Sequence, residues 1–249
     1  MSGQRPDFSP SYCENLTSSA NCGSLTLRNL LRNGFSVRAL LVDSEKILKC
    51  KNERQEFHIR NDDMTTPQEL RTRRLLLRSI ERGDIPAIVC LAGAREIATT
   101  TAKIPHPYTE NDAQSFLAHA EEDFREGRSV TFVVTILPGG ELCGAVGLVI
   151  TPEHERAELG YWMGVPYWGQ GFATEAATAV VAFGFEALRL NRIHASLFVG
   201  NTASQRVLEK IGMRHEGTSR LRVRKWNQSI EVEIYGLPAS EFRGAKTST

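Results

Sequence analysis

Two glycines one residue apart, Gly169 and Gly171, lie between a strand-like and a helix-like segment. Residues 157–163 (AELGYWM) have the composition of a strand, whereas apolar residues recur every three or four positions from Ala173 to Leu188, which is typical of a helix. Residues 166–177 (PYWGQGFATEAA) therefore predict a tight turn that leads directly into a helix N-terminus. Such a turn leaves amide groups without helical partners, and the helix dipole adds a preference for an anion.

Three phosphate-binding motifs contain glycines in this context. The P-loop requires a lysine after its second glycine, and no lysine follows Gly171. The dinucleotide fingerprint requires glycine or alanine where Thr174 stands, and it follows a βαβ unit, whereas antiparallel strands are expected here. A pyrophosphate clamp for coenzyme A and a plain helix cap without a ligand both remain compatible with the turn.

The sequence from residue 64 onward alternates strand and helix patterns, which predicts an α/β domain. Residues 74–80 suggest a strand, and Asp84 is expected to cap a helix whose first turn contains Pro86. A longer helix is expected from Thr109, which forms a capping box with Asp112. Residues 130–136, 141–150 and 157–163 predict three antiparallel strands in succession.

The helix after the glycines should extend to about Leu190, and a strand is expected over 193–199. Residues 202–212 predict a short helix with Thr202 and Gln205 as its capping box and Gly212 as its end. The final segment, 220–237, predicts a hairpin.

The predicted α/β domain covers residues 67–243, with a tail over 244–249 and a poorly ordered extension over 1–66. Met64 begins a segment that would form a compact domain by itself. A short docking helix over 25–41 is the alternative for part of the extension, and the Ser-rich, acid-poor segment 1–41 weakly resembles an organellar transit peptide.

Composition argues against several classes of partner. The 249 residues include 30 Lys and Arg against 29 Asp and Glu, so no nucleic-acid or membrane partner is expected. The five cysteines are widely spread without a metal-ligand spacing, which predicts reduced thiols, no metal site and a cytoplasmic location.

Two separate motifs in the right order resemble the GNAT superfamily of N-acetyltransferases. They are AELGYWMGVPYWGQGFATEAATAVVAFGF and HASLFVGNTASQRVLEKIGMRHEG, and the resemblance extends from about Arg71 to Phe242. Within the superfamily, the chain is most similar to the group of ribosomal-protein N-terminal acetyltransferases. The resemblance implies a central mixed, mostly antiparallel sheet that is splayed at the cofactor site and has helices on both faces.

The resemblance also implies acetyl-CoA as the acetyl donor. The superfamily's clamp pattern is Gln/Arg-x-x-Gly-x-Gly/Ala, and an aromatic residue stands at its first place here. The implied clamp consists of Trp168, Gly169, Gln170, Gly171, Phe172, Ala173 and Thr174. Backbone groups of Tyr161, Trp162 and Met163 should hydrogen-bond the pantetheine arm, and Asn201 should contact it through its side-chain amide. A simple turn role for Asn201 is the alternative.

The implied chemistry needs a base for the amine and a proton for the departing thiolate. Glu158 is the candidate base, through a water molecule, and a surface ion pair with Arg156 or a neighbour is the alternative role. The family's frequent tyrosine acid is absent because Leu208 occupies its place, so Ser204 is the candidate acid. A Cys143 nucleophile would need a paired base, which the sequence does not supply, so direct transfer is favoured.

The sequence thus predicts transfer of acetyl from acetyl-CoA to an amine, with a protein N-terminal α-amine as the expected acceptor. A small-molecule or antibiotic N-acetyltransferase is one alternative. A catalytically inactive acyl-CoA-binding regulatory module is the other. The chain is expected to act as a monomer or a homodimer.

Overall fold

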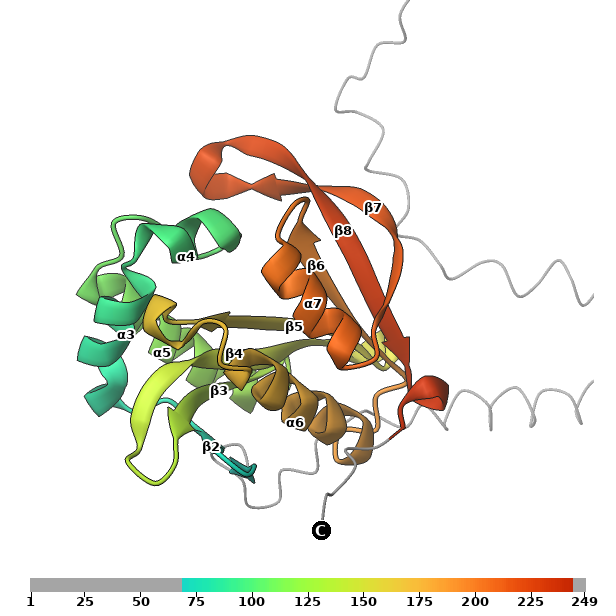
Figure 1. The fold of residues 1–249 in the computed structure, drawn as a ribbon, viewed down its shortest axis with the longest axis horizontal. Helices are drawn as coiled ribbons and strands as arrows, with labels where there is room; N and C mark the ends of the chain where they lie inside the picture. The colour runs from blue at the N-terminus through green and yellow to red at the C-terminus, as the bar shows by residue number, and fades with distance from the viewer. Residues whose placement is uncertain (1–68, 244–249) are drawn as a thin grey trace, which may run out of the picture. The chain divides into compact units, whose positions relative to one another are not determined.

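The computed structural model describes residues 69–243, so the predicted extension, its docking helix and the tail lie outside the described residues. In the described part, eight strands form one sheet in the order β1-β2-β3-β4-β5-β6-β8-β7 (Figure 1). Each neighbouring pair is antiparallel except β5 and β6, which run parallel. The predicted mixed, mostly antiparallel sheet is therefore confirmed.

Strands β2 to β6 and β8 follow the predicted hydrophobic segments, whereas β7 begins six residues before the predicted hairpin and β1 was not predicted. They are β1 (Leu70–Arg71), β2 (Leu75–Arg78), β3 (Ser129–Ile136), β4 (Glu141–Thr151), β5 (Arg156–Met163), β6 (Arg192–Phe198), β7 (Arg214–Val223) and β8 (Gln228–Pro238).

The helices cover both faces of the sheet. They are α3 (Ile85–Ala92), α4 (Arg95–Thr100), α5 (Glu110–Arg125), α6 (Phe172–Glu186) and α7 (Thr202–Lys210). On one face, α3 and α5 pack on Val133 and Leu142. On the other face, α6 and α7 bury apolar residues such as Val180 and Leu208 against Leu148 and Ala195. The larger core lies under α6 and α7.

Sequence patterns located the helix starts with mixed success. Thr109 and Asp112 form the predicted capping box of α5. Asp84 stands at the N-cap of α3, but its carboxylate accepts hydrogen bonds from the Arg78 guanidinium and the Glu81 amide instead of capping the helix. Burial disfavours the charged form of Asp84, but the Arg78 hydrogen bond, the Glu81 amide and the charge of Arg78 together outweigh it and lower the pKa of Asp84.

Two predicted helix boundaries were wrong. The N-cap of α7 is Asn201, whose side-chain oxygen accepts the Ser204 amide, so Thr202 and Gln205 do not form the box. An asparagine at the cap competes well with threonine because its oxygen reaches the same amide. Helix α6 ends at Glu186 rather than Leu190, and Arg189 in the following turn has a left-handed backbone with φ of 55°.

Candidate functional site

The glycine turn places three free amides at the start of α6. Gly169 and Gly171 have left-handed backbones with φ of 73° and 81°, which side-chain-bearing residues rarely adopt. The first intrahelical hydrogen bond runs from the Glu175 amide to the Gly171 carbonyl at 3.1 Å. The amides of residues 172–174 therefore have no helical acceptor, and they lie at the positive end of the α6 dipole.

Trp168 links this turn to the end of β5. Its indole nitrogen donates to the Met163 carbonyl at 2.6 Å, while its side chain remains 44% exposed and lines the cavity described below. The hydrogen bond leaves one lone pair of the Met163 carbonyl for a ligand. Gln170 differs from its predicted clamp neighbours because it does not line the cavity, and its side chain donates to the Pro166 carbonyl.

Arg74 supports the turn from the start of β2. Its guanidinium donates to the Gln170 carbonyl at 3.0 Å and to Glu175 Oε2 at 2.7 Å, and it lies over the Phe172 ring. Glu175 Oε1 accepts from the Thr72 hydroxyl and from the Arg74 amide. These contacts attach the turn and the first turn of α6 to the N-terminal strands.

Glu175 is a carboxylate in the same first helical turn that offers amides to an anion. Burial favours its neutral form, but the hydrogen bonds from Thr72 and Arg74 outweigh this effect and lower its pKa. Arg74 thus compensates a negative charge beside the free amides.

Strands β5 and β6 separate beyond Glu158. Their parallel pairing covers only Arg156 to Glu158 on β5 and Arg192 to His194 on β6, although β5 continues to Met163 and β6 to Phe198. The far halves of both strands therefore leave backbone groups facing a gap, with Tyr161 and Trp162 on the β5 side. The predicted splay of the sheet lies directly before the glycine turn.

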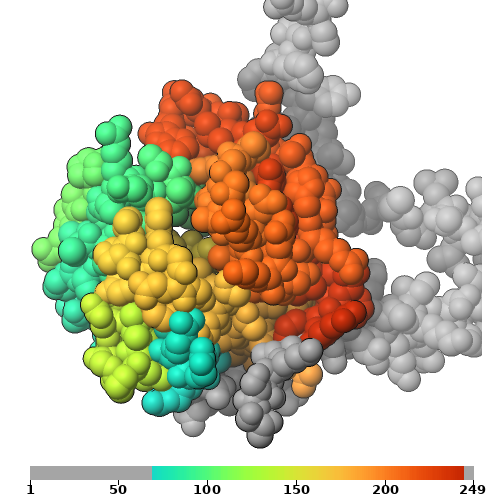
Figure 2. Space-filling model, in the orientation of Figure 1, coloured from blue at the N-terminus to red at the C-terminus, as the bar shows by residue number. Residues whose placement is uncertain are grey.

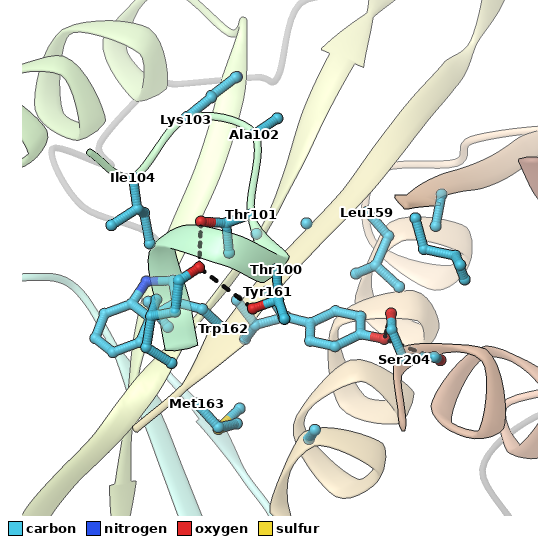
Figure 3. Close-up of a pocket in the computed structure, with 18 of the residues that line it drawn as sticks. Thr100, Thr101, Ala102, Lys103, Ile104, Leu159, Tyr161, Trp162, Met163 and Ser204 are labelled. Atoms are coloured by element: carbon cyan, nitrogen blue, oxygen red, sulfur yellow. Dashed lines mark hydrogen bonds between the residues drawn. The ribbon is translucent and has the colours of Figure 1, made fainter. Parts of the chain in front are cut away.

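Tyr161 crosses this gap to α7. Its hydroxyl lies 2.8 Å from Ser204 Oγ, and Figure 3 shows the two side chains meeting at one side of the cavity. Burial raises the pKa of Tyr161 to about 12, so the hydroxyl keeps its proton at neutral pH. The sequence had assigned Tyr161 a backbone role alone, because nothing in a single strand indicates a partner 43 residues away.

Asn201 fills the turn role and is also placed for the ligand role that the sequence left open. Its side-chain oxygen caps α7 by accepting the Ser204 amide at 3.1 Å. The residue also lines the cavity, and its side-chain NH₂ group is not required by the cap. The turn role and a ligand contact are therefore compatible.

Glu158 lies on the opposite sheet face from α6. It is exposed, lines the cavity, and stands in register between Val149 on β4 and His194 on β6. Within residues 69–243, Glu158 makes no ion pair, so the pairing with Arg156 is not formed there. Burial and the cationic neighbours Arg192 and Arg156 disfavour a charged His194, and its pKa is lowered despite the attraction of Glu158.

A cavity of about 980 Å³ connects these groups through the splay. Glu158, Tyr161, Trp162, Met163, Asn201, Ser204 and the predicted clamp residues except Gln170 all line it. Figure 2 shows an opening between the α3–α4 segment, the β5–α6 loop and α7. Arg206 and Lys210 of α7 also line the cavity. Their positive charge suits a phosphorylated ligand.

The cavity fits coenzyme A on three independent counts. Free amides with an N-terminal helix dipole suit its pyrophosphate. The unpaired edges of β5 and β6 suit the amides of its pantetheine arm, and the cavity is lined both by the start of α6 and by Glu158 on the opposite face of the sheet. Among the described residues no group of His, Cys, Asp and Glu could hold a metal ion.

Helices in the described range are all too short or too polar to cross a membrane.

A splayed α/β sheet with free amides at the start of α6, beside the splay, suits an acyl-coenzyme A-dependent transferase. The model of the acetyltransferase (GNAT) domain family matches residues 74–214, which is more than half of the chain. The chain therefore belongs to this family, and it is an acetyl-CoA-dependent N-acetyltransferase.

Known proteins agree with this assignment. The uncharacterized N-acetyltransferase p20 of Bacillus licheniformis is 31% identical over 179 residues, which cover 71% of this chain and 99% of that protein. A GNAT-family acetyltransferase from Bacillus anthracis aligns with a TM-score of 0.62 and 26% identity over 70% of this chain and all of its own. RimL, a ribosomal L7/L12 alpha-N-protein acetyltransferase solved with coenzyme A, shares the fold with a TM-score of 0.61 and 16% identity, over 69% of this chain and 98% of its own.

Sequence reasoning missed the supports of the site. Arg74 and Glu175 are 101 residues apart, so their pairing is not visible in any local pattern. The Tyr161 hydroxyl and Lys225, discussed below, were missed for the same reason. The only available signal was Glu175 in the first turn of a predicted helix, and that position favours acidic residues in any helix.

Proposed function

We propose that this enzyme acetylates the α-amine at the N-terminus of a protein by direct attack on the thioester. The observation that carries the proposal is Glu158, an exposed carboxylate without an ion pair among the described residues, which faces the cavity where β5 and β6 separate. A carboxylate is a weak base. It suits an α-amine, whose pKa is near 8, much better than a lysine amine with a pKa near 10.4.

Bound acetyl-CoA supplies the acetyl thioester. The free amides after Gly171 hold its pyrophosphate, and the unpaired edges of β5 and β6 align its arm so that the thioester lies near the splay. Glu158 accepts the amine proton through a water molecule as the new C–N bond forms and the C–S bond breaks. Ser204 donates its hydroxyl proton to the departing thiolate and regains one from Tyr161, which takes a proton back from solvent while Glu158 releases the amine proton to solvent.

Side-chain chemistry supports direct attack rather than a covalent acyl-enzyme. Cys143 is fully buried, does not line the cavity, and donates its thiol to the Val134 carbonyl. Burial raises the pKa of this thiol to about 12, so it carries almost no thiolate at neutral pH. Leu208 lines the cavity with an apolar side chain and cannot supply a proton. Ser204 and Tyr161 can supply the proton in place of a residue at position 208.

The solved structures support a protein acceptor by analogy alone, because RimL is described as acting on a ribosomal protein N-terminus. We place the reaction in the cytoplasm. The two described cysteines, Cys90 and Cys143, are both free, which agrees with a reducing compartment.

A thiol-release assay on the full chain tests the proposal. Acetyl-CoA is supplied with peptides that begin with a free α-amine, with the same peptides N-acetylated but carrying an internal lysine, with polyamines and with aminoglycosides. Thiol release with the free peptides alone is expected. Faster turnover of polyamines or aminoglycosides would contradict the protein acceptor, and binding of acetyl-CoA without turnover of any amine would indicate a regulatory module.

A further inference from the structure

The tip of the β7–β8 hairpin is attached to the loop after α4 by one ammonium group. Lys225 Nζ donates to the carbonyl oxygens of Ala98, Thr101 and Ile104, all within 2.6 Å. These partners are more than 120 residues away in sequence. In Figure 1 the hairpin tip lies above α4 at the edge of the domain.

The chemistry of this contact is specific to lysine. An ammonium has three donors and no acceptor, and it meets three acceptors here. The carbonyls belong to α4 and the loop after it, where the last carbonyls of a helix lack backbone partners and the dipole favours a cation. The Thr100 and Thr101 hydroxyls satisfy the Ile97 carbonyl, and Figure 3 shows these two threonines at the helix end. The helix end is therefore held by its own threonines and by Lys225 together. An arginine fork would not fit three converging carbonyls.

The two attached segments are opposite walls of the cavity. The loop contributes its residues 100–105, and the hairpin contributes Leu221 and Val232. Next to Lys225, the Trp226 ring packs against Phe198 at 5.4 Å, and Phe198 lines the cavity from β6. Lys225 itself lies 4.7 Å from the Trp226 ring centre. The Lys225 side chain therefore holds these two walls together on the sheet face that carries Glu158, and we call the joined walls the roof of the cavity.

We propose that Lys225 is a positioning residue. It closes the acceptor half of the cavity, which is the part next to Glu158, and limits how wide the acceptor can be beside its amine. This inference rests on the proposed function, in which the acceptor approaches Glu158 on that face. With the roof held, the site admits a slim segment with a small first side chain. Without the ammonium, the loop and the hairpin separate, and the acceptor is aligned less well while bulkier acceptors are admitted. The cofactor half, on the other side of the splay, is unaffected.

The test compares Lys225→Met, which keeps the stem and removes the donors, with the matched control Arg224→Met at the same hairpin tip. Steady-state kinetics use peptides that begin with Ser or with Trp and are otherwise identical. Lys225→Met should raise the KM for the Ser peptide about tenfold, shift the kcat/KM ratio toward the Trp peptide about tenfold, and leave the KM for acetyl-CoA within about twofold. Arg224→Met should change none of these values.

An unchanged peptide ratio, or a parallel rise in the KM for acetyl-CoA, would overturn the proposal. Hydrogen exchange of residues 98–104 gives a readout that does not need activity, and thermal melting confirms that the variant folds. Exchange should accelerate in Lys225→Met alone, and unchanged exchange would overturn the attachment. If the unaltered chain acetylates no peptide, the proposed function fails. The hydrogen-exchange data then test by themselves whether Lys225 attaches the loop to the hairpin.

Discussion

The cofactor half of the cavity is formed mainly by backbone groups, and the acceptor half mainly by side chains. The cofactor half consists mainly of backbone groups from one continuous segment, residues 161–174, whose shape is set by Gly169, Gly171 and the start of α6. The acceptor half is assembled from side chains of distant segments, including Glu158 on β5 and Lys225 on the hairpin. In this account the cofactor half depends on backbone shape and the acceptor half on individual side chains.

Replacing the base should have the largest effect on turnover and little effect on the donor. Glu158→Gln keeps the size of the side chain and removes its basicity, so kcat should fall about 1,000-fold with an unchanged KM for acetyl-CoA. The control is Glu153→Gln in the turn before β5, an exposed glutamate that does not line the cavity. Steady-state kinetics measure both variants. A loss in kcat smaller than about tenfold would remove Glu158 from the chemistry.

A change in the glycine turn should have the opposite effect, a large rise in the KM for acetyl-CoA. Gly171→Val places a β-branched residue at a φ of 81°, so the turn must change shape and the following amides lose their alignment. Loss of two charge-assisted hydrogen bonds predicts a rise in KM for acetyl-CoA of at least about 100-fold. Gly139→Val is the control, because an added Cβ there meets nothing within 4 Å and φ is not left-handed. Normal cofactor affinity in Gly171→Val would contradict the amide site.

The proton path should show coupling rather than addition. Ser204→Ala should lower kcat about 50-fold, and Tyr161→Phe should lower it less, because both act on one proton. The double variant should be no slower than Ser204→Ala, since groups in series do not contribute twice. Because burial raises the pKa of Tyr161 to about 12, its ionisation should cause no fall in activity near pH 10, the ordinary tyrosine value. If the losses in kcat of the two single variants add fully in the double variant, the two hydroxyls do not act on the same proton.

The smallest expected effect concerns the support behind the turn. Arg74→Met releases the Gln170 carbonyl and leaves the Glu175 carboxylate uncompensated beside the pyrophosphate site, so the KM for acetyl-CoA should rise about fivefold with kcat unchanged. Adding Glu175→Gln should recover part of the loss by removing the repulsive charge. The matched control is Arg71→Met, an exposed arginine on β1.

If the double variant Arg74→Met with Glu175→Gln binds acetyl-CoA more weakly than either single variant, the pair acts through stability alone. Thermal melting of all variants distinguishes this case, because a purely structural pair lowers the melting temperature in proportion to the loss of affinity.

The sequence predicted most of what depends on local patterns. The strands, the capping box at Thr109 and the glycine turn all follow from periods and turn chemistry within a few residues. The relationship of Tyr161 to Ser204 and of Arg74 to Glu175 could not be predicted, because each pair meets only after the sheet has formed. The α7 cap was misassigned because Asn201 and Thr202 are both good caps, and only the backbone decides between them.

Direct titration of coenzyme A into the full chain by calorimetry tests the division between the halves most directly. Three proteins are compared: the unaltered chain, Gly171→Val and Glu158→Gln. The account predicts that the Kd of Glu158→Gln stays within about twofold of the unaltered chain, whereas that of Gly171→Val rises at least about 100-fold. Equal losses of affinity in both variants, or full affinity in Gly171→Val, would contradict a donor site built from backbone and an acceptor site built from side chains.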